Sequence, residues 1–271
     1  MRHLFQRYVG SGLQSLSVAG YRIRGMRCTE SIPALIKEVG KKCPHLTKLE
    51  IHVAYLRKLP ITKLPQSLRH LELHSCEISK KWLLKECNMS PLPFLQHFVL
   101  DNVPAFNDKQ LKALSGLKAL CSLELVNIPL VSDEGLMVAF SEVEVFCNLK
   151  LVNSSLSADG LLRAVHQHFQ KLQKLIISVN GLTTKGLSQL ERMNSLQHLV
   201  LNGPPVSKDF PSTTHILSVC LKMPRLQTLK LLDVCTADQE SEDAKAHLQE
   251  MLLHCKVTIR SHQKPSTDWW K

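Results

Sequence analysis

The pattern Leu-x-x-Leu-x-Leu recurs along the chain and restricts its fold more than any other feature. Seven clear copies and two weaker ones, which start at Leu95 and Phe146, have their first positions at Leu13, Leu46, Leu68, Leu95, Leu120, Phe146, Leu172, Leu196 and Leu226. Successive first positions are 33, 22, 27, 25, 26, 26, 24 and 30 residues apart. Repeats of about 20–29 residues are typical of leucine-rich-repeat proteins.

Each copy has the pattern of a short strand with one buried face. The fourth and sixth positions point to one side of the strand, and the third, fifth and seventh to the other. One strand-plus-helix unit cannot bury its own leucines, so the units must stack. We therefore predict an α/β leucine-rich-repeat solenoid, or horseshoe, of about nine repeats. It has a concave parallel sheet and convex helices and forms a single elongated domain over residues 1–260, with a polar tail at 261–271.

Helices are expected between the strands, each starting at a residue that can cap the free N–H groups of a first turn. The predicted stretches are Ser79–Cys87, Asp108–Leu114, Ser132–Val143, Ser157–Phe169 and Thr183–Met193, with capping residues Ser79, Asn107, Ser132, Ser157 and Thr184. A last helix over Ser241–Leu253 and a short strand over Val257–Ile259 follow. Residues 1–12 are interpreted as a helical remnant, because Leu4, Phe5, Tyr8 and Val9 are spaced like one helix face.

The outward positions of the strands predict where a partner would bind. Early repeats place histidine and acidic residues there, and later repeats place an apolar stripe of Val99, Val126, Val152, Ile176 and Val200. An exposed apolar patch usually marks an interaction surface. The predicted contact residues for a protein partner are His74, Asp101, Val126, Val152, Ile176, Val200, Trp269 and Trp270. In an alternative of equal weight, Trp269 and Trp270 cover the stripe within the same chain.

The sequence offers little for catalysis, and we expect neither an enzyme nor a cofactor or metal site. His52, His70, His74, Glu50 and Glu72 suggest zinc, but same-face strand neighbours lie about 6.5–7 Å apart, too far to share one ion easily. Motifs such as G-x-S-x-G, a phosphate-binding glycine loop and H-E-x-x-H do not occur. Nine scattered cysteines without a C-x-x-C pair favour a reducing compartment, the cytoplasm or the nucleus. No apolar run is long enough for a membrane span.

The net charge of +11 is concentrated in residues 1–63, where 12 Lys and Arg face 3 Asp and Glu. A basic end favours acidic partners, whereas the simpler interpretation is a solvated surface that keeps the protein soluble. Phosphate contacts to nucleic acid would come from Arg22, Arg24, Arg27, Lys37, Lys41 and Lys42. No recognised nucleic-acid motif accompanies them, so nucleic acid is not the expected partner.

Several segments resemble one particular family. Cys43-Pro44-His45-Leu46-Thr47-Lys48-Leu49 looks like the C-P-x-L-x-x-L opening of repeats in F-box proteins with leucine-rich repeats. The resemblance extends over the whole chain and continues at Leu100–Phe106 and Leu156–Asp159. Its most specific segments are Leu71–Ser79 and the terminal Asp268-Trp269-Trp270. It implies a substrate receptor of a Skp1–cullin–F-box (SCF) ubiquitin ligase, which promotes proteolysis of the bound substrate. Such a receptor supplies proximity rather than covalent chemistry.

The start of the chain departs from that family plan. An F-box is a helical module of about 40–50 residues before the first repeat, whereas here the first repeat begins at Leu13. Leu59-Pro60 and Leu64-Pro65 superficially resemble the start of an F-box but lie between repeats. We therefore expect the chain to capture substrate, and to recruit Skp1 and cullin 1 only if an F-box lies upstream. The alternative is a free-standing scaffold or inhibitor without a ubiquitin link.

Overall fold

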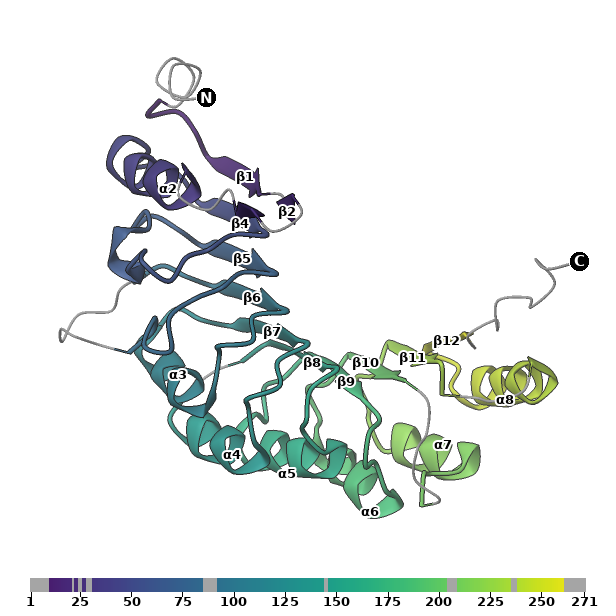
Figure 1. The fold of residues 1–271 in the computed structure, drawn as a ribbon. Coiled ribbons are helices and arrows are strands. Elements are labelled where there is room, and N and C mark those ends of the chain that lie inside the picture. The colour runs from purple at the N-terminus through teal and green to yellow at the C-terminus, as the bar shows by residue number, and fades with distance from the viewer. Residues whose placement is uncertain are drawn as a thin grey trace, which may run out of the picture. The chain divides into compact units, whose positions relative to one another are not determined.

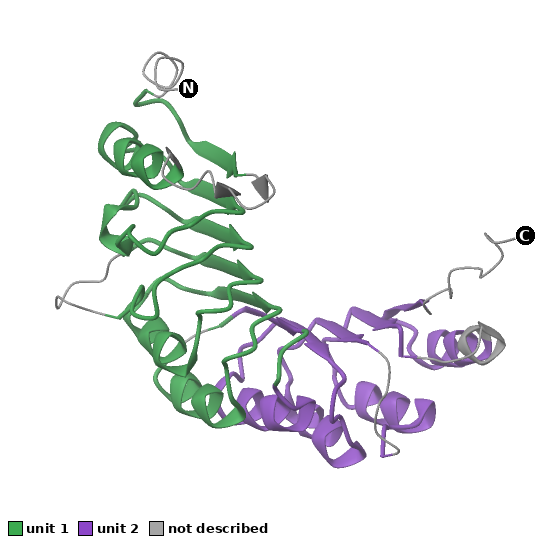
Figure 2. Cartoon of the chain, viewed as in Figure 1, with its two compact units in different colours: residues 1–146, 153–155 green, residues 147–152, 156–271 purple. Residues whose placement is uncertain are grey.

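The computed structural model describes residues 10–20, 22–23, 26–27, 31–84, 92–143, 146–203, 209–234 and 238–260. It contains two compact units (Figure 2). Unit 1 comprises Met1–Phe146 with Asn153–Ser155, and unit 2 comprises Cys147–Val152 with Leu156–Lys271. Of the helical remnant predicted over residues 1–12, residues 1–9 lie outside the described residues, as do the two tail tryptophans, and residues 10–12 are not helical.

Unit 1 is built on a parallel sheet whose strands neighbour one another in chain order (Figure 1). Its strands are β1 (Ser15–Ala19), β4 (Lys48–His52), β5 (His70–His74), β6 (His97–Asp101) and β7 (Ser122–Val126). Equivalent motif positions lie side by side, so Leu49 pairs with Leu71. The short strands β2 (Arg22–Ile23) and β3 (Met26–Arg27) form a separate antiparallel pair.

Unit 2 repeats this arrangement with a second run of parallel strands. They are β8 (Asn148–Val152), β9 (Lys174–Ser178), β10 (His198–Asn202), β11 (Thr228–Leu232) and β12 (Lys256–Arg260). Here too the register matches motif to motif, since Leu175 pairs with Leu199 and Leu199 with Leu229. Strand β12 confirms the short final strand predicted around Val257.

Helical segments connect the strands and lie on one side of the sheet in each unit (Figure 1). Unit 1 has α2 (Ser31–Lys42), η1 (Ile61–Lys63), α3 (Asp108–Ala113), η2 (Leu114–Gly116) and α4 (Asp133–Ser141). Unit 2 has α5 (Ala158–His168), α6 (Thr184–Leu187), η3 (Ser188–Arg192), α7 (Thr213–Leu221) and α8 (Asp238–Met251). In the part of the chain that the structure describes, no helix combines the length and apolar character needed to cross a bilayer.

The predicted leucine-rich-repeat fold is confirmed at the level of single motif positions. In the repeat that starts at Leu46, the first, fourth and sixth residues are all fully buried. The third, fifth and seventh residues of the same repeat are only half-buried and lie on the other face. The leucine spine therefore forms the core between strands and helical segments, and the outward residues of this repeat lie on the opposite, less buried sheet face.

Two helix predictions need correction. Residues 79–84 are not helical, and residues 80–83 form a turn, because the Trp82 indole N–H donates to the carbonyl of Leu59 at 2.7 Å and fixes the segment against the preceding repeat. Residues 85–91 are not described. The cap of α6 is Thr183 and not Thr184, and only Thr184–Leu187 is α-helical before the chain tightens into η3. The predicted caps Asn107, Ser132 and Ser157 are confirmed.

Aspartates on the helices join consecutive repeats. The Asp108 carboxylate accepts from the backbone N–H of Ser132 at 2.8 Å and from its hydroxyl at 2.7 Å. The Ser132 hydroxyl accepts in turn from the N–H of Gly135 and caps α4. The same arrangement recurs in unit 2, where Asp159 accepts from Thr183 at 2.9 and 2.6 Å. These contacts, which the sequence analysis missed, tie the start of α4 to α3 and the start of α6 to α5.

Candidate protein-binding surface

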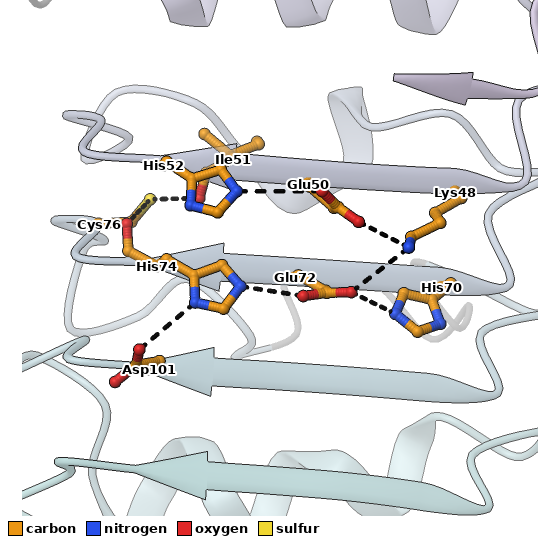
Figure 3. A network of polar contacts seen from close by, with 9 residues as sticks. All are labelled: Lys48, Glu50, Ile51, His52, His70, Glu72, His74, Cys76 and Asp101. Carbon is orange, nitrogen blue, oxygen red and sulfur yellow. Dashed lines mark hydrogen bonds and ion pairs between the residues drawn. The ribbon is translucent and has the colours of Figure 1, made fainter. Parts of the chain in front are cut away.

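The open face of the unit 1 sheet carries a polar network centred on Glu72 of β5 (Figure 3). The two Glu72 carboxylate oxygens lie 2.7 Å from His70 Nε2 and 2.9 Å from His74 Nε2. Lys48 Nζ, on the neighbouring strand, lies 3.7 Å away. Desolvation by burial would raise the pKa of Glu72, but the contacts with His74, His70 and Lys48 outweigh it and leave the pKa below its usual value. Glu72 is therefore an ionised acceptor that holds two imidazoles in place.

Lys48 and Asp101 extend this network to both neighbouring strands (Figure 3). Lys48 Nζ lies 2.6 Å from a Glu50 oxygen, and this contact lowers the pKa of Glu50. On the other side, Asp101 lies 3.4 Å from His74 Nδ1 and accepts from the Asn127 amide at 3.0 Å. The predicted contact residues His74 and Asp101 are thus brought together, both half-buried and facing outward.

Imidazole rings stack across the strands of the same face. The rings of His52 and His74 lie 4.5 Å apart and nearly parallel, and those of His70 and His97 lie 5.3 Å apart. Desolvation and the neighbouring His70 lower the pKa of His97, and Glu124 opposes this shift. The face is therefore a packed and hydrogen-bonded surface rather than a set of separate solvated side chains.

The histidine and acidic side chains of this face form hydrogen bonds and ring contacts with one another. Among the described residues, no group of three or more His, Cys, Asp and Glu side chains has an arrangement that could hold a metal ion. The buried Cys76 thiol contacts the carbonyls of Ile51 and His74, and desolvation raises its pKa to about 11. A thiol with such a pKa is protonated at neutral pH, which agrees with a packing role for Cys76.

The open face of unit 2 has a different chemistry. Its outward positions hold the predicted apolar residues Val152, Ile176 and Val200. The stripe was expected to be exposed, but Val152 is only 6% and Val200 only 8% exposed, whereas Ile176 is half-buried. Neighbouring strands lie about 4.8 Å apart, so side chains in register shield one another. In unit 1, Val126 is half-buried.

Lysines surround these apolar residues, and the sequence analysis did not single them out. Lys150, Lys174 and Lys230 occupy third or fifth motif positions, from which the register alone places them on the open face. Lys174 and Lys230 are exposed. Of the basic residues considered for nucleic acid, Lys37, Lys41 and Lys42 are exposed on α2.

The repeated strand, the buried leucine spine and the open sheet face define a leucine-rich-repeat protein. Two solved structures share the fold. The structure of TLR13 in complex with ssRNA13 matches with a TM-score of 0.57 and 19% identity over 96% of this chain and 34% of that chain. A Bacteroides fragilis protein matches with a TM-score of 0.50 and 12% identity over 94% of this chain and 68% of its own. No family model matches the chain.

Relatives that match this chain over its whole length assign it to a narrower family. The chain is 43% identical to human F-box/LRR-repeat protein 12 over 270 residues, which cover 100% of this chain and 82% of the relative. The Bos taurus protein is also 43% identical and the Mus musculus protein 42%, over the same shares. The chain therefore belongs to the F-box/LRR-repeat protein 12 family.

Proposed function

We propose that this chain is the substrate-recognition part of an SCF ubiquitin ligase and promotes ubiquitin-dependent proteolysis of the proteins it binds. The observation that carries the proposal is the identity of 43% over the whole chain with a protein whose name joins an F-box to leucine-rich repeats. An F-box receptor acts by proximity, since it holds the substrate near a ubiquitin-loaded enzyme and supplies no reacting group itself. The repeats of this chain would supply the holding surface.

The open sheet faces are the proposed substrate-binding surface. His74, Asp101 and Val126 form its part in unit 1, and Val152, Ile176 and Val200 its part in unit 2. The ordered imidazoles and carboxylates of unit 1 favour this role, because binding to a preorganised surface costs little side-chain entropy. We place this activity in the cytoplasm or the nucleus, because all six described cysteines are free thiols.

The proposal also assigns the tail tryptophans to substrate contact, with coverage of the chain's own apolar stripe as the competing role. Two tryptophans bring a large apolar area to either task. Deletion of residues 261–271 separates the two roles. A loss of substrate affinity at unchanged melting temperature indicates contact, and a fall in melting temperature indicates coverage. If both quantities are unchanged, the tail has neither role.

Affinity purification from cells tests the function as a whole. The 271-residue chain and the same chain joined to an F-box should recover the same substrates, whereas Skp1 and cullin 1 should appear only with the joined form. Substrates of the joined form should rise in abundance when the proteasome is inhibited. Recovery of partners whose abundance does not respond would instead favour the free-standing scaffold.

A further inference from the structure

The open faces of the two units carry opposite charge. In unit 1, Glu50, Glu72, Asp101 and Glu124 outnumber the single lysine at outward strand positions, Lys48. In unit 2, no aspartate or glutamate occupies an outward position on strands β8 to β12, all of which the structure describes. Basic residues occupy five of these positions: Lys150, Lys174, Lys230, Lys256 and Arg260.

The lysines of unit 2 surround an apolar centre. Ile176 of β9 pairs with Val200 of β10, and Val200 pairs with Lys230 of β11. On the other side, Lys150 of β8 pairs with Ile176. Lys174 precedes Ile176 by two residues and lies on the same face. Positive charge thus borders the two apolar side chains both along a strand and across the strands.

Protection of the exposed sheet edge against pairing with another strand explains only some of the basic residues on this face. Lys256 and Arg260 lie on β12, the last strand of the sheet order, where basic side chains commonly discourage edge-to-edge pairing. Lys174 and Lys230 lie on inner strands, which have no free edge to protect. Both are exposed, and none of the ion pairs between described residues involves either lysine. These two lysines therefore carry the inference.

We propose that the open face of unit 2 binds an acidic, extended protein segment in which an apolar residue lies between acidic residues. The apolar residue would contact Ile176, the half-buried member of the apolar centre, and the acidic residues would pair with Lys174 and Lys230. The inference rests on the proposed function, because it gives the chemistry of the substrate segment that the repeats hold. Charge complementarity of this kind speeds encounter and selects among partners.

Other occupants fit the face less well. Residues 261–271 of this chain contain Lys264 and Lys271 against the single acidic residue Asp268, so their charge does not complement the lysines. The acidic face of a second copy already uses Glu72 to hold His70, His74 and Lys48. Single-stranded nucleic acid usually stacks its bases on aromatic rings, and no Phe, Tyr or Trp occupies an outward position on β8 to β12.

The test measures binding of a fluorescent peptide in which glutamates and leucines alternate, with a lysine-for-glutamate version as the charge control. We expect the full chain to bind the acidic peptide, with affinity falling as salt screens the charges. Lys174→Gln with Lys230→Gln should weaken binding about tenfold, since charged hydrogen bonds are among the stronger polar contacts. The matched control is Lys185→Gln with Arg192→Gln on α6 and η3, which removes the same charge elsewhere and should change affinity less than about twofold.

Several results would overturn the inference. These are no binding of the acidic peptide at low salt, an equal loss in the control variant, or tighter binding of an oligouridylate than of the peptide. Self-association that disappears in the Lys174/Lys230 variant would assign the face to a second copy. Cellular substrates still recovered by that variant would leave the proposed function standing and remove only this inference. If the acidic peptide binds but no cellular substrate is recovered, the proposed function falls, whereas the acidic-segment chemistry of this face stands.

Discussion

At the scale of single residues, the turn after a strand depends on a left-handed backbone. The residue after a strand has positive φ at Val53, Ser75, Asn102, Asn127, Asn153, Gly203 and Asp233. This conformation points the N–H of Asn102 at the carbonyl of Val126 on the next strand, at 2.9 Å. Asparagine, aspartate and glycine adopt it at low cost, whereas a β-branched residue is strained there. Val53, with φ of 52°, is the β-branched case.

Replacement of Val53 by Asn should therefore stabilise the protein by about 1 kcal/mol, because the left-handed backbone costs asparagine less than valine. Urea unfolding monitored by circular dichroism measures the effect. The reverse change, Asn127→Val, should destabilise by at least as much, since the Asn127 amide also donates to Asp101. A variant Val53→Asn that is less stable than the parent would show that the valine side chain contributes more by packing than its backbone strain costs.

The histidine face predicts a dependence of stability on pH through His97. Desolvation and His70 lower the pKa of His97 in the folded state, against an ordinary value of 6.5. As the pH drops through 6.5, His97 in the unfolded chain takes up a proton more readily than His97 in the folded protein. The free energy of unfolding should therefore fall over this range. Glu72, whose folded pKa is also lowered, adds a further loss at more acidic pH. His97→Gln should flatten the first loss in melting temperatures recorded from pH about 7.5 to about 5.5. An unchanged slope would exclude His97 as its source.

At the scale of elements, the aspartate contacts explain why two helices start with a glycine near the cap. A Cβ on Gly135 would overlap the Asp108 carboxylate, and a Cβ on Gly186 would overlap that of Asp159. Alanine is normally the better helix former by about 1 kcal/mol. The positions therefore hold glycine because the aspartate of the preceding repeat occupies the space that a methyl group would need.

Gly186→Ala should accordingly destabilise the protein by about 2 kcal/mol despite the higher helix propensity of alanine. Asp159→Ala alone should cost a similar amount, because Thr183 loses its acceptor. With both changes present, the loss should be smaller than the sum by at least about 1 kcal/mol, since the methyl group then fills the vacated space. Additive losses in denaturant unfolding would mean that the glycine and the carboxylate do not compete.

At the scale of the whole molecule, the repeat pattern predicted nearly every strand, because a period of two with buried leucines has few alternative structures. The strand that starts at Lys256 was correctly predicted from three residues. The segment from Ser79 was wrongly predicted as a helix, because the bond from Trp82 to Leu59 is a tertiary contact without a local signal. Burial of a side chain by residues on neighbouring strands is also non-local, which is why the burial of Val152 and Val200 was missed. The charge contrast between the two open faces was also missed, although the motif register alone places the lysines of unit 2 on the outward face.

The central claim is that substrates bind on the open sheet faces and not on the helices. The helices offer a rival surface, because Val138 on α4 is 48% and Leu221 on α7 is 52% exposed. Site-specific photo-crosslinking to a captured substrate compares the two sides directly, with the reactive residue placed at Val126, Ile176, Val138 or Leu221 in turn. The account predicts crosslinks from Val126 and Ile176 and none from Val138 and Leu221. Crosslinks confined to the two helix positions would contradict it.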